Sequence, residues 1–262
     1  MPWGQLASSR PGKPNPLNLE LTPTVADALF DLPDAENYAS LISRDWVSTK
    51  RYGTPSNYAK QLRCLSNDAW SFGKVRNWTP EMLTSSARTD HTEISRRRFK
   101  STAYGKVEPI SRLFKLDPSG ISNTLRAGTD SSRGAFTSPR PIHPKHNRCI
   151  TVREMARLHG FPDWFRFHQT KWHGARQIGN AVPPPLARAV AKEVITALGY
   201  EPKCSSETLE LGEKKLLTMD VSEASRYWNI KNPIKQRDRK SGDRKRSQAE
   251  IERQLKEMVA AE

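Results

Sequence analysis

The clearest hydrophobic pattern in the chain predicts a short capped helix that begins after Thr151. The threonine hydroxyl can accept a hydrogen bond from the amide three residues later, and Glu154 can reach back, so the two form a capping box. Met155 and Leu158 then supply apolar positions at helical spacing. Gly160 is placed to end the helix, because glycine tolerates the left-handed conformation.

A second helix is predicted to begin at three consecutive prolines, Pro183 to Pro185. Proline is tolerated in the first helical turn, where the backbone amides have no partner. The Gly179-Asn180 dipeptide before it is a turn signal, and Gly199 closes the helix. The bridge between the two helices, residues 168–176, is expected to form a loop. The second helix carries a spaced apolar face, made of Leu186, Val190, Val194 and Leu198.

Weaker patterns predict four further elements. A short helix capped by Thr24 should end before Pro33, and residues 121–129 are typical of a strand that enters a glycine turn. Residues 221–228 could form one short helix. A capping box at residues 247–250 begins a short terminal helix.

The composition favours a nucleic-acid partner. Of 262 residues, 35% are hydrophobic, and the mean hydropathy is −0.74, so we expect a small core for this length. The formal net charge of +15 favours a polyanion, which is usually nucleic acid. No apolar run approaches the roughly 18 residues of a membrane span, and residues 1–16 lack an apolar signal core, so neither a membrane partner nor export is expected.

The cysteines suggest a reducing compartment and no metal site. Cys64, Cys149 and Cys204 are far apart and odd in number, which argues against a disulfide scaffold. The spacing of His143, His146 and Cys149 invites a zinc interpretation. A fourth ligand at typical spacing is missing, so we predict no metal.

Basic and aromatic residues are interleaved between residues 38 and 106. Cations of this kind neutralise phosphates, and aromatic rings can pack on sugars and exposed bases. The alternative is an ordinary solvated surface, with the tryptophans holding a small core. A second basic stretch, residues 231–246, is most often a linker and would add salt-sensitive, non-specific affinity for DNA.

Two long strings carry a resemblance to a known family. Residues 148–163 read R-x-x-T-x-R-E-x-A-R-L-x-G-F-P-D, and residues 177–184 read Q-I-G-N-A-V-P-P. Both resemble, in the correct order, the last two signature motifs of the DNA (cytosine-5) methyltransferases, motifs nine and ten. Residues 22–33 are similar to the segment after motif eight, and Thr124-Leu125 is similar to a pair near the end of the family's recognition region.

The resemblance implies an α+β fold class. The expected architecture is a small mixed target-recognition domain plus C-terminal helices that would complete a Rossmann-like methyltransferase domain. We expect a lead-in and linker at residues 1–37 and the target-recognition region at 38–147. Motifs nine and ten follow at 148–200, and a basic tail with a short terminal helix occupies 201–262.

The resemblance also implies site residues. Asn180 and Ala181 are expected to line part of the pocket for S-adenosyl-L-methionine, with a partner chain, although Asn180 could equally serve only the turn. Arg133 could read a guanine or contact a phosphate. Arg153, Glu154 and Arg157 are expected to be structural, and Lys171 and Arg176 are weaker candidates for phosphate contacts. The residues expected to bind double-stranded DNA are Thr124, Leu125, Arg126, Arg133 and Arg148.

The reactive motifs of the family are missing from this sequence. The family's nucleophile lies in Pro-Cys-Gln and its acid in Glu-Asn-Val, and neither string occurs here. We therefore predict no catalytic residue, no methyl transfer by the lone chain, and a partner chain that carries motifs one to eight. Family habit places such a pair in a restriction–modification system of a prokaryotic cytoplasm. The alternatives are a catalytically inactive basic DNA-binding remnant and an inert fragment.

Overall fold

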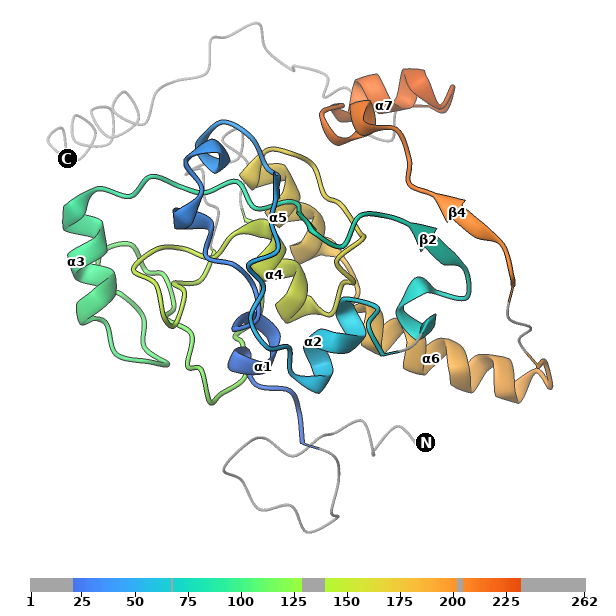
Figure 1. Cartoon of the computed structure of the whole chain (residues 1–262), viewed down its shortest axis with the longest axis horizontal. Coiled ribbons are helices and arrows are strands. Elements are labelled where there is room, and N and C mark those ends of the chain that lie inside the picture. Colours follow the sequence, from blue (N-terminus) through green and yellow to red (C-terminus); the bar gives the residue numbers. More distant parts are fainter. Residues whose placement is uncertain (1–20, 67, 129–139, 202–204, 232–262) are drawn as a thin grey trace, which may run out of the picture. The chain divides into compact units, whose positions relative to one another are not determined.

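The computed structural model describes residues 21–66, 68–128, 140–201 and 205–231 (Figure 1). The chain divides into two compact units, residues 1–219 and 220–262, and each is described by itself. The predicted terminal helix at 247–258 and nearly all of the basic stretch 231–246 lie outside the described residues. No helix in the described part of the chain is both long enough and apolar enough to cross a bilayer.

The first unit is built mainly of short helices joined by irregular segments. Here η marks a 3-10 helix. In chain order the elements are α1 (Val25–Leu29), η2 (Ala35–Asn37), η3 (Ala39–Ile42), β1 (Val47–Ser48), α2 (Asn57–Leu62), η4 (Asp68–Ser71), β2 (Val75–Asn77), β3 (Met82–Leu83), α3 (Glu93–Ser101), α4 (Val152–His159), α5 (Lys171–Asn180), α6 (Pro184–Ala197), β4 (Thr208–Glu210) and η6 (Lys214–Leu217).

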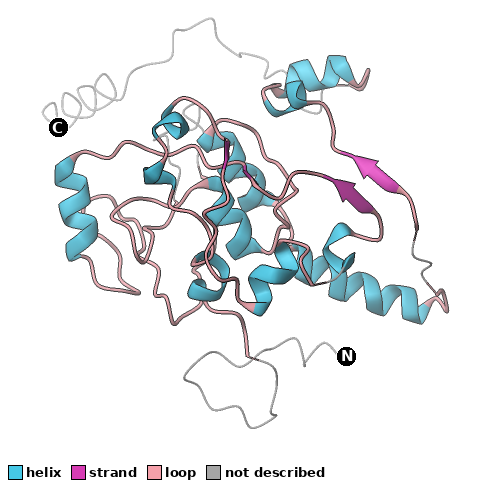
Figure 2. Cartoon of the chain, in the orientation of Figure 1, coloured by secondary structure: helices cyan, strands magenta, loops and turns pink. Residues whose placement is uncertain are grey.

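Strands are few and short in this unit, as the magenta segments of Figure 2 show. β1 and β3 pair antiparallel, with Val47 opposite Leu83. β2 and β4 pair parallel, with Val75 opposite Thr208. These paired strands are only two or three residues long, so they join neighbouring segments and form no extended sheet in the described residues. The fold is therefore a mixed α+β arrangement in which helices dominate.

The main core lies where α4 packs against α1 on one side and α5 on the other. Aromatic residues after α4 close this core, and the rings of Phe161 and Phe167 meet edge to face with centroids 5.0 Å apart. Burial of such side chains is the principal driving force of the fold. The buried members of this core are Val25, Ala28, Leu29, Leu116, Leu125, Ile150, Val152, Met155, Ala156, Phe161, Phe167, Ala175 and Ile178.

The helix boundaries predicted from capping signals are largely confirmed. α4 begins after Thr151, whose hydroxyl forms the predicted capping box with Glu154, and Gly160 ends the helix with a φ of 86°. α1 is capped by Thr24 in the same way, but it ends at Leu29, before the predicted stop. α6 begins within the three prolines. In the second unit, α7 (Val221–Tyr227) forms where a short helix was predicted.

The expected loop at residues 168–176 is wrong, because α5 occupies most of it. The buried residues of α5 are Gly174, Ala175 and Ile178, and two of these are too small to give a hydrophobic signal in the sequence. A Cβ at position 174 would lie 2.9 Å from the His168 carbonyl oxygen, so the close approach of this helix requires glycine. Helix α5 is therefore stabilised by close packing against α4 rather than by a strong apolar pattern in its sequence.

The strand expected at residues 121–129 is also wrong as far as it is described, because residues 121–128 form no strand. No described segment pairs with them as a strand. Leu125 anchors the segment, because its side chain is 7% exposed and belongs to the main core. The apolar residue is therefore used for packing rather than in a sheet.

Candidate functional site

Arg148, the first residue of the motif-nine string, is buried beside two carboxylates. Its guanidinium donates to both oxygens of Glu154, each at 2.8 Å, and to Oδ1 of Asp34 at 3.0 Å. Burial alone would raise the pKa of Glu154, but the adjacent Arg148 more than offsets this and lowers that pKa to about 2. Glu154 also accepts from the Thr151 amide at 2.7 Å, so one carboxylate joins the cap to the ion pair.

Two further arginines of α4 have similar roles. Arg157 donates to Asp163 through Nε at 2.6 Å and to Asp31 through Nη1 at 2.9 Å. Arg153 donates to the Thr84 carbonyl oxygen at 3.2 Å and to its hydroxyl at 2.8 Å. These contacts connect segments that are far apart in the sequence. The structural role predicted for Arg153, Glu154 and Arg157 agrees with their burial and bonding.

This geometry corrects the DNA contact expected of Arg148. The side chain is 1% exposed, and its donors are directed at Glu154, Asp34 and the Cys149 carbonyl oxygen. To reach a phosphate, it would have to leave two buried carboxylates unpaired, which is strongly unfavourable. The DNA contact predicted for Leu125 is also wrong, because its side chain lies in the core and does not face solvent.

Two of the three remaining DNA candidates lie on either side of Leu125. Thr124 and Arg126 are exposed, and Arg133 lies outside the described residues. Lys171, a weaker candidate, donates from Nζ to the Arg88 carbonyl oxygen at 2.9 Å, so this ammonium group is already engaged. Thr124 and Arg126 therefore remain predictions that the structure leaves accessible.

The two candidate cofactor residues lie where α5 gives way to α6. Asn180 is the last residue of α5 and is exposed, whereas Ala181 packs against the main core. The Ala181 carbonyl oxygen lies 3.0 Å from Nε2 of His159, which holds this turn against α4. Within the described chain, the side-chain amide of Asn180 has no hydrogen-bond partner, so it is free to bind a polar ligand group.

Gly179 brings the candidate DNA segment to the candidate cofactor turn. A Cβ at this position would lie 2.5 Å from the Ala127 nitrogen and 2.6 Å from the Arg126 carbonyl carbon. Such distances do not occur for real side chains, so glycine is required for this close approach. The structure thus places Thr124 and Arg126 on a segment that touches the turn carrying Asn180.

Helix α6 leaves most of its apolar face bare within the described chain, and of the four residues predicted on that face Val190 is partly buried. Pro184 is its one buried residue. Its start is fixed, since the ring of Pro185 lies against Gly160 and would be 2.5 Å from a Cβ there. Apolar side chains on or beside the helix are exposed by the following fractions: Val182 61%, Leu186 42%, Val194 52% and Leu198 64%. Such a bare apolar stripe is typical of a surface that another polypeptide covers.

The histidines and cysteine that suggested zinc have other roles here. Nδ1 of His143 accepts from the backbone amides of Lys145 at 3.0 Å and of His146 at 3.1 Å. Cys149 is buried, and burial raises the pKa of its thiol. In the described ranges no group of three or more histidine, cysteine or acidic residues could hold a metal ion.

Comparison with known proteins identifies the wider relationship. Residues 10–196 match the family of C-5 cytosine-specific DNA methylases. The chain is 51% identical over 252 residues to the type II methyltransferase M.XorII of Xanthomonas oryzae, a match that covers 95% of this chain and 59% of that protein. It is 49% identical over 196 residues to DNA (cytosine-5)-methyltransferase 4 of Arabidopsis thaliana, covering 67% of this chain and 12% of that protein.

A solved structure gives the same relationship in three dimensions. A prophage-encoded E. coli protein, provisionally described as a DNA modification methyltransferase, aligns with a TM-score of 0.51 and 33% identity. The alignment covers 69% of this chain and 49% of that one. The chain thus spans only part of the length of the relatives it matches. With the family match covering most of its length, this chain belongs to the C-5 cytosine-specific DNA methylases.

Proposed function

We propose that this chain supplies DNA target recognition and part of the S-adenosyl-L-methionine pocket of a DNA cytosine-5 methyltransferase, acting as its C-terminal subunit or segment. The rest of the enzyme, with motifs one to eight, would lie on other residues, either in a separate chain or in a longer polypeptide. The observation that carries this proposal is the bare apolar face of α6 beside the exposed Asn180.

The residues at the turn fit one edge of a methyl-donor pocket. The Asn180 amide is an unused polar group, and Ala181 and Val182 continue the surface without charge. The cofactor, when bound, supplies the methyl group. What this chain would contribute is orientation: Asn180 would hold a polar group of the cofactor, and α6 would hold the turn against the covering partner.

The neighbouring segment would contribute the DNA contacts. Thr124 and Arg126 are exposed and lie next to Gly179, so a bound duplex and a bound cofactor would approach adjacent surfaces. The net charge of +15 supports a DNA substrate, because phosphate neutralisation dominates such binding. A restriction–modification system in a prokaryotic cytoplasm is the setting we propose, in keeping with the type II methyltransferase that the chain resembles.

Co-expression tests this function directly. The chain is expressed alone or with a polypeptide that carries motifs one to eight of a close relative, and transfer of tritium-labelled methyl groups to unmethylated DNA is measured. We expect incorporation only from the pair. Robust incorporation by the chain alone, or none from a pair that associates, would contradict the proposal.

Substitutions in α6 test the exposed apolar face on which the proposed function depends. Val194→Asp introduces a charge on the exposed apolar face and should abolish association with the partner, because burying an unpaired charge is costly. Lys192→Asp is the matched control, since two residues along a helix turn the side chain to roughly the opposite side. Equal association of both variants with the partner would count against this docking surface.

An inactive DNA-binding remnant is the second candidate, and the strong positive charge favours it. This candidate predicts sequence-independent binding with a steep salt dependence and no effect of any partner. The co-expression experiment separates the two, because a remnant would not restore methylation.

A further inference from the structure

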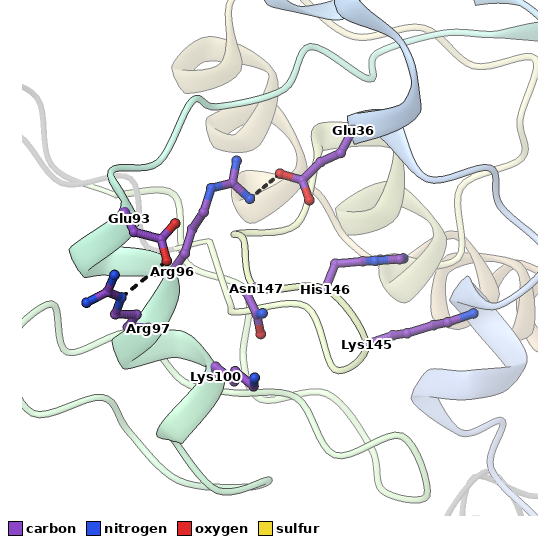
Figure 3. A pocket seen from close by; sticks show the side chains of 8 residues that line it. All are labelled: Glu36, Glu93, Arg96, Arg97, Lys100, Lys145, His146 and Asn147. Carbon is purple, nitrogen blue, oxygen red and sulfur yellow. Dashed lines mark hydrogen bonds and ion pairs between the residues drawn. The ribbon is translucent and has the colours of Figure 1, made fainter.

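A hollow of about 480 Å³ opens between helix α3 and the loop that precedes α4 (Figure 3). No apolar side chain lines it, so it does not suit an apolar ligand. Four cationic side chains outnumber two carboxylates, which favours an anion. The lining residues are Glu36, Glu93, Arg96, Arg97, Lys100, Lys145, His146 and Asn147.

Helix α3 supplies one wall as a single stripe. Glu93, Arg96, Arg97 and Lys100 stand at positions i, i+3, i+4 and i+7, which share one helical face. Both carboxylates of the hollow are already paired. Glu36 accepts from Arg96, and Glu93 lies 3.2 Å from Nε of Arg97, as the dashed lines of Figure 3 show. Neither acid therefore neutralises the lysines.

The unpaired positive charge belongs to Lys100 and Lys145. Both side chains are exposed, and within the described chain neither ammonium group has a hydrogen-bond or ion-pair partner. In Figure 3, Lys100 reaches from α3 toward Asn147 of the loop, while Lys145 extends from the loop away from α3. The Asn147 amide adds a neutral donor without a partner among the described residues.

The two walls are held together independently of any ligand. The Cys149 amide donates to Nε2 of His91, just before α3, at 3.2 Å. Phe99 of α3 packs with Cys149 in a second small apolar cluster. The loop is closed by its own amides, since Nδ1 of His143 accepts from the Lys145 amide at 3.0 Å. The backbone segments that carry Lys100, Lys145 and Asn147 are thus fixed before an anion arrives, which lowers the ordering cost of binding, and the lysine side chains need only turn toward it.

From this arrangement we propose that the hollow receives one backbone phosphate of double-stranded DNA, with Lys100 and Lys145 supplying charge and Asn147 a neutral hydrogen bond. The inference rests on the proposed function, because that function makes DNA the substrate. Contacts of this kind position a protein on the duplex and carry no sequence information. The hollow would therefore contribute to affinity and leave the choice of target bases unchanged.

The test measures the salt dependence of duplex binding by the full-length chain. Fluorescence anisotropy of a labelled mixed-sequence duplex is followed across a range of salt concentrations. For Lys100→Gln/Lys145→Gln, the slope of log affinity against log salt should become shallower by about 0.9, the value for one lost phosphate contact. The matched control is Lys192→Gln/Lys214→Gln, which removes the same charge from exposed positions outside the expected recognition region and should keep the original slope.

The outcomes separate this inference from the function it rests on. If the unaltered chain binds the duplex and both double variants show the same slope, the hollow is not a phosphate site. If the unaltered chain binds no duplex, the proposed DNA recognition fails and the hollow fails with it. Inorganic phosphate is the second probe, at constant ionic strength. Displacement of the duplex by micromolar phosphate would overturn the assignment, because the hollow would then be a site for the free anion.

Discussion

The backbone of Ala127 lies against Gly179 so closely that a Cβ on the glycine would stand 2.5 Å from the Ala127 nitrogen. The glycine belongs to α5, one residue before Asn180, and Ala127 follows the exposed Arg126. The segment expected to face DNA and the turn expected to face the methyl donor are therefore in contact. The motif-ten string therefore requires glycine at position 179 for packing, independently of any role of Asn180 and Ala181 in binding the cofactor.

Gly179→Ala should destabilise the chain. Alanine normally stabilises a helix by up to about 1 kcal/mol relative to glycine. The clash with rigid backbone is the larger effect, and overpacking of this kind costs about 1–3 kcal/mol. We expect a lower midpoint of urea unfolding. Gly212→Ala is the control, since its nearest atom would be a Leu216 methyl carbon at an ordinary 3.4 Å. A stabilised Gly179→Ala variant would show that the two segments do not pack in this way.

Arg148→Gln should reduce stability without changing the salt dependence of DNA binding. The substitution leaves Glu154 buried with its main counter-charge removed, and breaking such a pair costs about 3–5 kcal/mol. Because Arg148 is buried, no phosphate contact should be lost. Urea unfolding and duplex titrations measure the two quantities separately. Unchanged stability with a shallower salt slope would restore the DNA role that the sequence suggested.

Arg126→Gln should change the salt dependence of DNA binding and leave the stability of the chain unchanged. Arg126 is exposed, and its side chain has no ion-pair partner in the described ranges. A lost phosphate contact should make the salt slope of duplex binding shallower by about 0.9. The midpoint of urea unfolding should stay the same. Arg226→Gln, at an exposed arginine of α7 outside the expected recognition region, is the control, and equal slopes for both variants would remove Arg126 from the DNA-binding surface.

Acid should destabilise the chain through His143. Burial lowers the pKa of this imidazole from 6.5 to about 3, and protonated Nδ1 could no longer accept the amides of Lys145 and His146. Below pH 6.5 the unfolded chain binds a proton that the folded chain excludes, so stability is full above that pH and is lost as the pH falls toward 3. Each pH unit in this window should cost about 1.4 kcal/mol.

His143→Asn isolates this effect. The asparagine oxygen can accept the same loop amides but does not titrate, as in an Asx turn. The unfolding free energies of the two proteins should be similar at pH 7.5 and should diverge between pH 6.5 and 4.5, the unaltered chain losing more. This window lies above the ordinary pKa of Glu154, which keeps that carboxyl out of the comparison. Parallel pH profiles would contradict the assignment.

Much of the local structure could be predicted from short-range signals. The capping boxes at Thr24 and Thr151, the glycine stop at Gly160 and the proline start of α6 depend on neighbouring residues only, and the structure confirms them. The motif strings identified the family for the same reason, since they are contiguous. The apolar face of α6 could also be read from the spacing of its apolar residues, but its exposure is a finding of the structure.

Other features depended on contacts between distant segments. α5 was missed because its buried face is made of Gly174, Ala175 and Ile178, whose burial comes from α4 rather than from a strong apolar pattern. Arg148 was expected at the DNA surface because an arginine in a basic sequence carries no sign of its partners. Asp34, which is 114 residues away in the sequence, comes within hydrogen-bond distance of Arg148 only in the folded chain. A buried guanidinium must be paired with carboxylates, so Arg148 binds these instead of a phosphate.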